Sequence, residues 1–233
     1  MALLNWIRRL RGRDLSASYA DSSIAPKQRR LVDEQLQAMR SGQSPQHFQV
    51  VGRILSGLKE QAGARSFSLL DAGCGSGYYS EIIHHFVPGG IHYIGVDFNL
   101  GMLSMARQYY PGLSVGRMDL RWLAVRDASV DLVMSGAAIV HIREWDAALK
   151  ELTRVTRKWL LLHRTLVCKL TPTSVSVERH YEKDVYRVRI SEAELLALIG
   201  TLGMDLIMKC DAGEGQVPDD QENNTYLFER RLS

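Results

Sequence analysis

Cysteine is scarce in this chain of 233 residues, and its three cysteines, Cys74, Cys168 and Cys210, lie far apart. No two of them form a C-x-x-C pair, and none has a histidine at the spacing typical of a zinc site. The pattern therefore argues against a disulfide framework and against structural zinc. It is typical of a protein from a reducing compartment.

Long hydrophobic runs are missing as well. No apolar stretch approaches the ~20 residues that are needed to cross a membrane. The start of the chain carries arginines where a signal peptide would have its apolar segment. Together with the cysteine usage, these absences predict a cytoplasmic protein.

A strong excess of one charge is also lacking. The formal net charge is +3, and residues 1–20 account for it through four arginines against Asp14. The rest of the chain is close to neutral, so it carries no general signature of nucleic-acid binding. With 45% hydrophobic and 24% charged residues, the composition predicts one globular α/β domain with an appendage.

The appendage begins with residues 1–13, in which leucines, Trp6 and Ile7 alternate with arginines. A short basic amphipathic segment of this kind can lie on an anionic membrane surface or contact a partner. It can equally be a frayed end, or a helix that packs on its own domain. After it, the sequence predicts a helix that starts near Pro26 and ends before Gly42, and a second that follows Ser44 and Pro45.

The most informative stretch is residues 68–80, an apolar run that ends in Asp71 and is followed by Gly73, Gly75 and Gly77. It predicts a buried strand, a tight turn and a helix start, which together can hold a nucleotide-like ligand. The dinucleotide fingerprint needs its third glycine one position later, where this chain has Tyr78. The carboxylate of Asp71 would repel a pyrophosphate and favours a ligand that carries positive charge.

Further strands follow in a regular βα order. The second, residues 91–97, ends in Asp97, about 24 residues after Gly73, near the spacing at which an acidic residue reaches ribose hydroxyls. The alternative for Asp97 is a helix N-cap. We predict further strands at residues 113–117, 129–135, 159–162, 204–210 and 225–231, with helices at 79–86, 99–110, 146–155 and 192–202. Residues 168–190 lack a clear periodicity.

The motif D-A-G-C-G-S-G at residues 71–77 resembles the first motif of the class I S-adenosylmethionine-dependent methyltransferases, and the resemblance extends over residues 66–231. It implies a three-layer Rossmann-like α/β sandwich. The expected sheet has seven strands and is mostly parallel, with an antiparallel last strand. Residues 61–233 would form this domain, and residues 1–60 would add N-terminal helices as a cap within the same domain.

The resemblance also assigns parts of S-adenosylmethionine to successive strand ends. The turn after Asp71 would hold the amino-acid tail, Asp97 the ribose, and the segment around Asp119 the adenine. Trp122 would cover the adenine or pack on the surface, alternatives that the sequence leaves open. The expected cofactor-binding residues are Asp71, Gly73, Cys74, Gly75, Gly77, Asp97, Phe98, Met118, Asp119, Leu120 and Ser135.

Methyl transfer needs a positioned nucleophile, and it needs a base only if the acceptor holds its proton. His141, which follows the fourth strand, is the candidate catalytic base; the alternative is a histidine that only lines the pocket or is satisfied in the core. Possible acceptor contacts are His163, Arg164, His180, Tyr181 and Tyr186. The fourth strand ends in Ser135 and Gly136 where a metal-ligating carboxylate would be needed, so we expect no catalytic metal.

The sequence therefore predicts metal-independent methyl transfer to an oxygen or nitrogen of a small molecule. One alternative is a partner module that binds the cofactor without turnover, and another is a nicotinamide-dependent oxidoreductase. Nucleic acid is disfavoured as acceptor, because the N-P-P-[YFW] motif for amino groups of bases is missing after the fourth strand. Information on the acceptor is expected in residues 1–60, 136–145 and 163–190.

Overall fold

The structure is a computed structural model that describes residues 21–180, 182–213 and 219–231. The amphipathic segment 1–13 and Tyr181, both singled out from the sequence, lie outside the described residues. In the part of the chain that is described, no helix has the length and apolar character required to traverse a bilayer.

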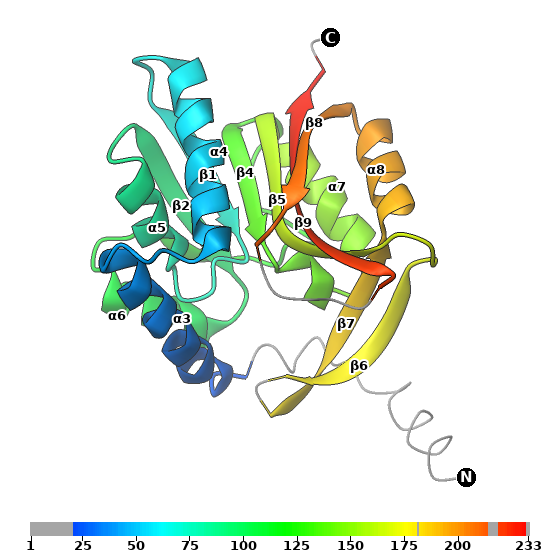
Figure 1. Ribbon diagram of the computed structural model, residues 1–233, viewed down its shortest axis with the longest axis horizontal. Coiled ribbons are helices and arrows are strands. Elements are labelled where there is room, and N and C mark those ends of the chain that lie inside the picture. The colour runs from blue at the N-terminus through cyan, green and yellow to red at the C-terminus, as the bar shows by residue number, and fades with distance from the viewer. Residues whose placement is uncertain (1–20, 181, 214–218, 232–233) are drawn as a thin grey trace.

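Helices and strands alternate along most of the chain (Figure 1). The helices are α3 (Ile24–Arg40), α4 (Gln46–Ala62), α5 (Tyr79–Phe86), α6 (Leu100–Tyr109), the 3-10 helix η1 (Ile139–His141), α7 (Trp145–Val155) and α8 (Glu192–Thr201). The strands are β1 (Phe67–Ala72), β2 (Ile91–Asp97), β3 (Val115–Arg117), β4 (Val130–Gly136), β5 (Thr156–Cys168), β6 (Ser174–His180), β7 (Lys183–Ser191), β8 (Met204–Asp211) and β9 (Gln221–Arg230).

The described strands form one central sheet. Its parallel part runs in the order β3-β2-β1-β4-β5, and β9 joins β5 as an antiparallel strand with β8 outside it. This mostly parallel sheet confirms the predicted α/β fold, including the antiparallel last strand. The sheet has nine strands where seven were expected, because β6 and β7 add a hairpin at the end of β5.

Both faces of the sheet are covered, which explains why its central strands are apolar on both sides. Leu69 faces a cluster with Leu36 and Phe48 from α3 and α4, whereas Leu70 faces a cluster with Leu149 from α7. Burial on two sides fixes the register of β1, and the carboxyl ends of β1, β2 and β4 therefore meet at one edge of the sheet. That edge carries the predicted site.

Strand β5 differs from its prediction. The apolar run suggested a strand ending at Leu162, but β5 continues to Cys168, so His163 lies inside it. The polar residues continue the strand because β9 supplies a partner along its length. The pairing with β9 shifts between Leu162 and Thr165, and Arg164 adopts a φ of 56° there, which is the geometry of a β-bulge.

The segment 168–190 also differs, because most of it forms the β6–β7 hairpin. Strand β6 is exposed along much of its length and alternates Val175 and Val177 with polar residues, so it offers little apolar signal. Strand β7 buries Val185, Val188 and Ile190. Long-range burial therefore stabilises a hairpin that local periodicity did not predict.

Candidate functional site

The turn after β1 is held by backbone hydrogen bonds to the end of β2. The N–H groups of Gly73 and Cys74 both donate to the carbonyl oxygen of Val96, at 2.8 and 3.0 Å. Gly73 has a φ of 83°, and a Cβ added to it would lie 2.3 Å from the Cβ of Ala138. Glycine is therefore required here both by the backbone conformation and by the close approach of the segment after β4.

Helix α3 approaches the same turn from the other side. Gly75 has a φ of 54°, and a Cβ there would lie 2.8 Å from Nε2 of Gln28. The hydroxyl of Ser76 donates to Oε1 of Gln28 at 2.9 Å. The sequence reasoning missed Gln28 and Ser76, because no local pattern indicates which residue of a distant helix will contact the turn.

Asp97 connects the glycine turn to the start of α6. Its Oδ2 accepts from the N–H of Gly75 at 2.9 Å, and its Oδ1 accepts from the N–H of Asn99 at 2.8 Å. Burial raises the pKa of Asp97, and these N–H groups oppose the rise. Asn99 is the residue that caps α6, since its side chain accepts from the N–H of Met102. Asp97 therefore joins the glycine turn to the start of α6 and does not serve as the N-cap.

Asp71 lies beneath the turn and is completely buried. The hydroxyl of Tyr93 donates to its Oδ2 at 2.6 Å, whereas its Oδ1 has no hydrogen-bond partner within the described residues. Burial raises the pKa of Asp71 to about 7, with a further rise from the charge of Asp97 and an opposing effect of the Tyr93 hydrogen bond. A buried carboxylate oxygen without a partner is costly and calls for a physical explanation.

Two other predicted cofactor residues face inward. Cys74 is 1% exposed, and its Sγ lies against Gly95, so its backbone is the part that borders the turn. The hydroxyl of Ser135 donates to the carbonyl oxygen of Ala72 at 3.0 Å and joins the ends of β1 and β4. Both side chains therefore support the shape of the edge.

The segment after β3 places Met118 and Asp119 half-buried and Leu120 in the core. Arg121 donates to both carboxylate oxygens of Asp119, with a shortest distance of 2.7 Å, and this contact lowers the pKa of Asp119. The side chain of Trp122 is 80% exposed, in agreement with the alternative in which it packs on the protein surface. Phe98 is half-buried beside this segment, and its carbonyl oxygen accepts from Nε of Arg117.

Two strained residues adjoin each other where β4 ends and β5 bulges. Ala137 has a φ of 60° and Arg164 one of 56°, values that non-glycine residues rarely adopt. The N–H of Ala137 donates to the carbonyl oxygen of His163 at 2.9 Å and so connects the two segments. Backbone strain of this kind concentrates at functional sites.

His163 and its neighbours form a buried polar group at the same edge. His163 is completely buried, its Nδ1 lies 2.8 Å from Oγ1 of Thr225, and burial places its pKa well below the usual range. Its ring meets that of Tyr79 edge to face at 6.0 Å between centroids, and it stacks with that of His47 at 6.5 Å. His47 and Tyr79 were missed by the sequence reasoning, which assigned both segments to helices without knowing which face would meet β5.

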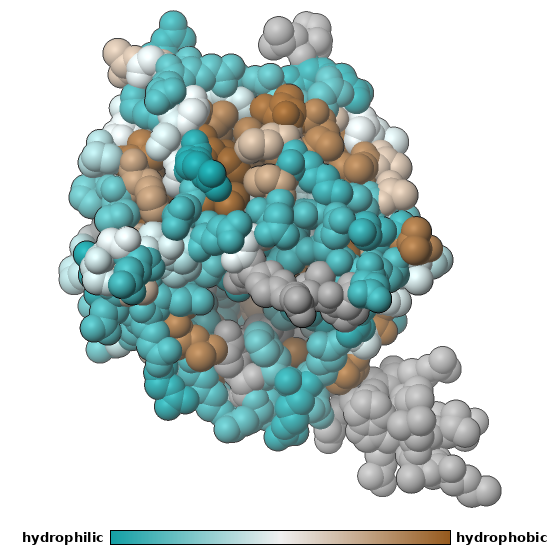
Figure 2. Space-filling view, in the orientation of Figure 1, coloured by the Kyte–Doolittle hydropathy of each residue, from teal (hydrophilic) through white to brown (hydrophobic). Residues whose placement is uncertain are grey.

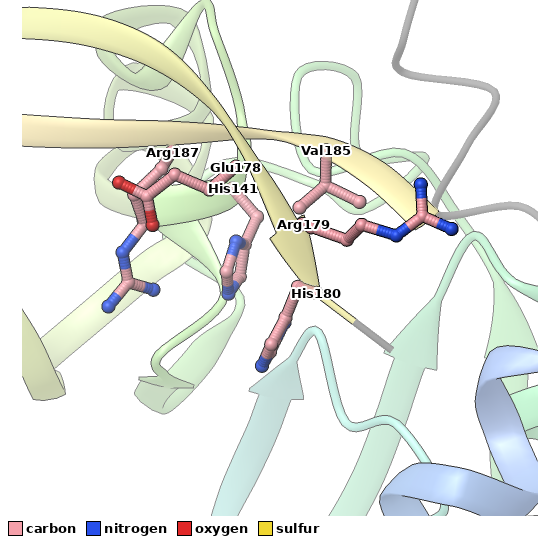
Figure 3. Close-up of a pocket in the computed structure, with 6 residues that line it drawn as sticks. All are labelled: His141, Glu178, Arg179, His180, Val185 and Arg187. Carbon is pink, nitrogen blue, oxygen red and sulfur yellow. The ribbon is translucent and has the colours of Figure 1, made fainter. Parts of the chain in front are cut away.

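His141 lies in a pocket between η1 and the hairpin (Figure 3). Its Nδ1 is 3.3 Å from the carbonyl oxygen of Tyr186, and its ring stacks on that of His180 at 5.6 Å. Burial, followed by the positive charge of Arg187, lowers the pKa of His141 to about 3. The imidazole is therefore neutral at physiological pH. Among the described residues, no group of three or more histidine, cysteine, aspartate or glutamate side chains could hold a metal ion.

Comparison with known sequences adds to this geometry. Residues 70–159 match a family model described as a methyltransferase domain. A malonyl-acyl-carrier-protein O-methyltransferase of Yersinia pestis is 37% identical over 39% of this chain and 33% of its own length. A probable S-adenosylmethionine-dependent methyltransferase of Mycolicibacterium smegmatis is 30% identical over 59% of this chain and 52% of its own. The chain thus spans about a third to a half of these relatives.

Solved structures show the same fold at low sequence identity. The magnesium protoporphyrin IX methyltransferase of Synechocystis, solved with bound S-adenosylmethionine, superimposes with a TM-score of 0.58 and 17% identity, covering 80% of each chain. A (4+2)-cyclase, SpnF, superimposes with a TM-score of 0.59 and 16% identity, covering 79% of this chain and 83% of its own. The second match shows that a protein named for a different reaction shares this architecture.

Proposed function

We propose that this chain, which has the fold and motifs of the class I S-adenosylmethionine-dependent methyltransferases, transfers the methyl group of S-adenosylmethionine to a small-molecule acceptor. The observation that carries the proposal is the contact between the glycine turn and Asp97. It brings the ends of β1 and β2 together at the position where open α/β sheets bind ligands.

The residues at this edge fit the cofactor. Gly73 and Gly75, both at positive φ, let Ala138 and Gln28 approach the turn closely, and this shapes the backbone whose N–H groups are held by Val96 and Asp97. The carboxylate of Asp97 accepts backbone N–H groups at both oxygens, and its remaining lone-pair capacity suits a ribose hydroxyl. The unpartnered Oδ1 of Asp71 suits the ammonium group of the amino-acid tail. S-adenosylmethionine, when bound, supplies a methyl carbon activated by its sulfonium.

The segment after β3 would hold the adenine. Phe98, Met118 and Leu120 offer apolar surface, and Asp119 offers oxygens for the exocyclic amino group. Arg121 already donates to both of these oxygens, so an adenine would share them with the guanidinium. We therefore expect Asp119 to contribute less to affinity than Asp97.

On the acceptor side, His141 is better suited to positioning than to strong base catalysis. A base is most effective when its pKa lies near the working pH, and burial has moved that of His141 to about 3. A neutral imidazole whose Nδ1 faces the carbonyl oxygen of Tyr186 can present Nε2 as an acceptor to a substrate hydroxyl or amine. It would orient the nucleophile and receive a proton only as the methyl transfer proceeds.

We also propose that α3 and α4 belong to the catalytic domain as a cap. Leu36 and Met39 of α3 and Phe48 of α4 share one apolar cluster with Leu69 of β1, and Gln28 contacts the glycine turn. A cap with this much shared core would move only if part of the core opened.

The alternative is a module that binds the cofactor without turnover. The low pKa of His141 favours it, and the cyclase with this architecture indicates that the fold accommodates activities other than methyl transfer. A nicotinamide-dependent oxidoreductase is disfavoured, because the buried Asp71 lies beneath the turn that would have to hold a pyrophosphate.

Calorimetry separates these possibilities. The full chain should bind S-adenosylhomocysteine, whereas NADH should produce no heat above dilution. Incubation with methyl-labelled S-adenosylmethionine and fractionated cell extract should then label a small-molecule fraction. Binding without label in any metabolite, RNA or protein fraction would support the non-catalytic module. A well-folded sample that fails to bind S-adenosylhomocysteine would overturn the proposal.

A further inference from the structure

The β6–β7 hairpin and η1 enclose a pocket of about 110 Å³, lined by His141 of η1 and by Glu178, Arg179, His180, Val185 and Arg187 of the hairpin. Its location connects it with the proposed cofactor site. Helix η1 begins directly after Ala138, whose Cβ lies against Gly73 of the glycine turn. Whatever occupies the pocket therefore lies on the acceptor side of that turn.

The arginines of the hairpin differ in their partners. Arg179 pairs with Asp184 at 3.5 Å, and Arg189 pairs with Glu178. Arg187 lies between them on the pocket wall, and no carboxylate of the described residues pairs with its guanidinium. Figure 3 shows this guanidinium on the same side as the rings of His141 and His180, whereas Arg179 points away. The pocket thus contains one uncompensated positive charge.

The two histidines respond to that charge. The pKa of His180 is lowered first by burial and then by Arg187, in the same order as that of His141. The stacked imidazoles are therefore neutral and add polar surface without further charge. An anion placed against Arg187 would balance its positive charge.

We propose that this pocket binds a carboxylate group of the methyl acceptor and that Arg187 is the residue that selects it. This inference rests on the proposed methyltransferase function and adds the substrate class. The planar guanidinium fork matches a carboxylate in two parallel hydrogen bonds. One unpaired cation balances one negative charge, and the nearby carboxylate of Glu178, although paired with Arg189, disfavours a dianion such as phosphate.

Binding of simple probes to the full chain tests the inference. The probes are benzoate, its neutral counterpart benzamide, and inorganic phosphate, each titrated in the presence of saturating S-adenosylhomocysteine. Benzoate should bind at least about 10-fold more tightly than benzamide and more tightly than phosphate. Arg187→Gln should weaken benzoate at least about 10-fold, the effect expected for a lost charge-assisted hydrogen bond.

Lys183→Gln is the matched control, because Lys183 is a cation of the same hairpin that does not line the pocket and pairs with Asp21. It should leave benzoate affinity within about 2-fold of the parent, and Arg187→Lys should retain an intermediate affinity, since it keeps the charge and loses the fork. Thermal melting of each variant separates loss of the pocket from loss of the fold. Equal benzoate affinity in Arg187→Gln and the parent would overturn the inference.

Other outcomes are equally decisive. Absence of benzoate binding, equal affinity for benzamide, or tighter binding of phosphate would each contradict a carboxylate pocket. Titration with S-adenosylhomocysteine alone keeps the two proposals apart. If the parent and Arg187→Gln both bind it normally while benzoate results fail, only the acceptor class is wrong; if the parent does not bind it, the proposed function itself fails.

Discussion

The two sides of the site are built from different kinds of interaction. On the proposed cofactor side, backbone hydrogen bonds hold the turn: the N–H groups of Gly73, Cys74 and Gly75 donate to the Val96 carbonyl and the Asp97 carboxylate. On the proposed acceptor side, side chains define the pocket through ring stacking and ion pairs, as in His141 on His180 and Arg189 with Glu178. The surface over α3 and the β6–β7 hairpin is mostly hydrophilic (Figure 2).

This difference indicates which changes each side tolerates. A backbone cradle depends on glycines and on a few acceptors, so most side-chain substitutions leave it intact. A pocket of side chains can change its specificity by one substitution without affecting the fold. The sides are joined by Lys183 of the hairpin, which pairs with Asp21 at 2.7 Å, and by Lys27 of α3, which pairs with Glu182. Both pairs are partly exposed and contribute little.

The largest effect is expected for Gly73→Ala. The added Cβ would require a strained φ and would lie 2.3 Å from the Cβ of Ala138. We expect a destabilisation of about 2–3 kcal/mol and a loss of S-adenosylhomocysteine affinity of at least about 100-fold. Calorimetry and denaturant unfolding measure the two quantities.

Gly112→Ala is the control that isolates the cost of placing alanine at a positive φ. Its φ is 85°, close to that of Gly73, but an added Cβ would meet no atom within 4 Å. It should cost about 1 kcal/mol and leave cofactor affinity unchanged. Equal effects of the two substitutions would show that the close approach to Ala138 contributes nothing to the site.

The same contrast explains what the sequence could predict. The turn, the strands β1, β2 and β4, and the helices α5 and α7 follow from local patterns, because buried parallel strands are apolar throughout and glycines mark the turn. Asp71 and Asp97 were found for the same reason, since each ends an apolar run, whereas Asp119 was assigned from the family resemblance. The positions of Asp71 and Asp97 at one edge of the sheet follow from the parallel order of β1 and β2.

The acceptor side depends on contacts between distant segments. Strand β6 is exposed along much of its length and offers little apolar signal, and β5 continues beyond its apolar run because β9 pairs with it. Gln28 reaches the turn from a helix 45 residues earlier than Gly73 in the sequence. Such placements require the tertiary structure, and the pocket at Arg187 could not be derived without it.

The second prediction concerns Asp97→Asn. An amide keeps one acceptor oxygen where the carboxylate uses two, so either the Gly75 or the Asn99 contact is lost along with the charge. We expect S-adenosylhomocysteine affinity to fall about 10- to 100-fold. Asp119→Asn should cost less, because Arg121 already engages that carboxylate. A larger loss at Asp119 than at Asp97 would reverse the assignment of the two carboxylates.

The third prediction uses the pH dependence of Asp71. Its pKa in the folded protein is raised to about 7, above its ordinary value of 3.8, so its contribution to stability is present below pH 4 and is lost as the pH rises toward 7. Asp71→Asn removes this loss. The melting temperature of the variant relative to the parent should therefore increase from pH 4 to pH 8, by roughly 5 °C.

The same variant should bind S-adenosylhomocysteine more weakly, because the ammonium group loses its negative partner. Stability and affinity would then change in opposite directions at one residue. A variant that is less stable than the parent by the same amount at every pH would show that Asp71 is not a buried titrating group.

The smallest effect is expected for His141→Gln, which tests through the pH dependence of the melting temperature whether the pocket around His141 is buried. Burial lowers the pKa of His141 to about 3 in the folded chain, below its ordinary value of 6.5, so its contribution is present above pH 6.5 and is lost as the pH falls toward 3. Glutamine does not titrate, and the fall in melting temperature between pH 7 and pH 5 should be smaller by about 2–4 °C. His92→Gln, at an exposed position on β2, should leave that fall unchanged. If both substitutions act alike, the pocket around His141 is open to water, and the contrast between a turn held by backbone hydrogen bonds and a pocket of buried side chains does not hold.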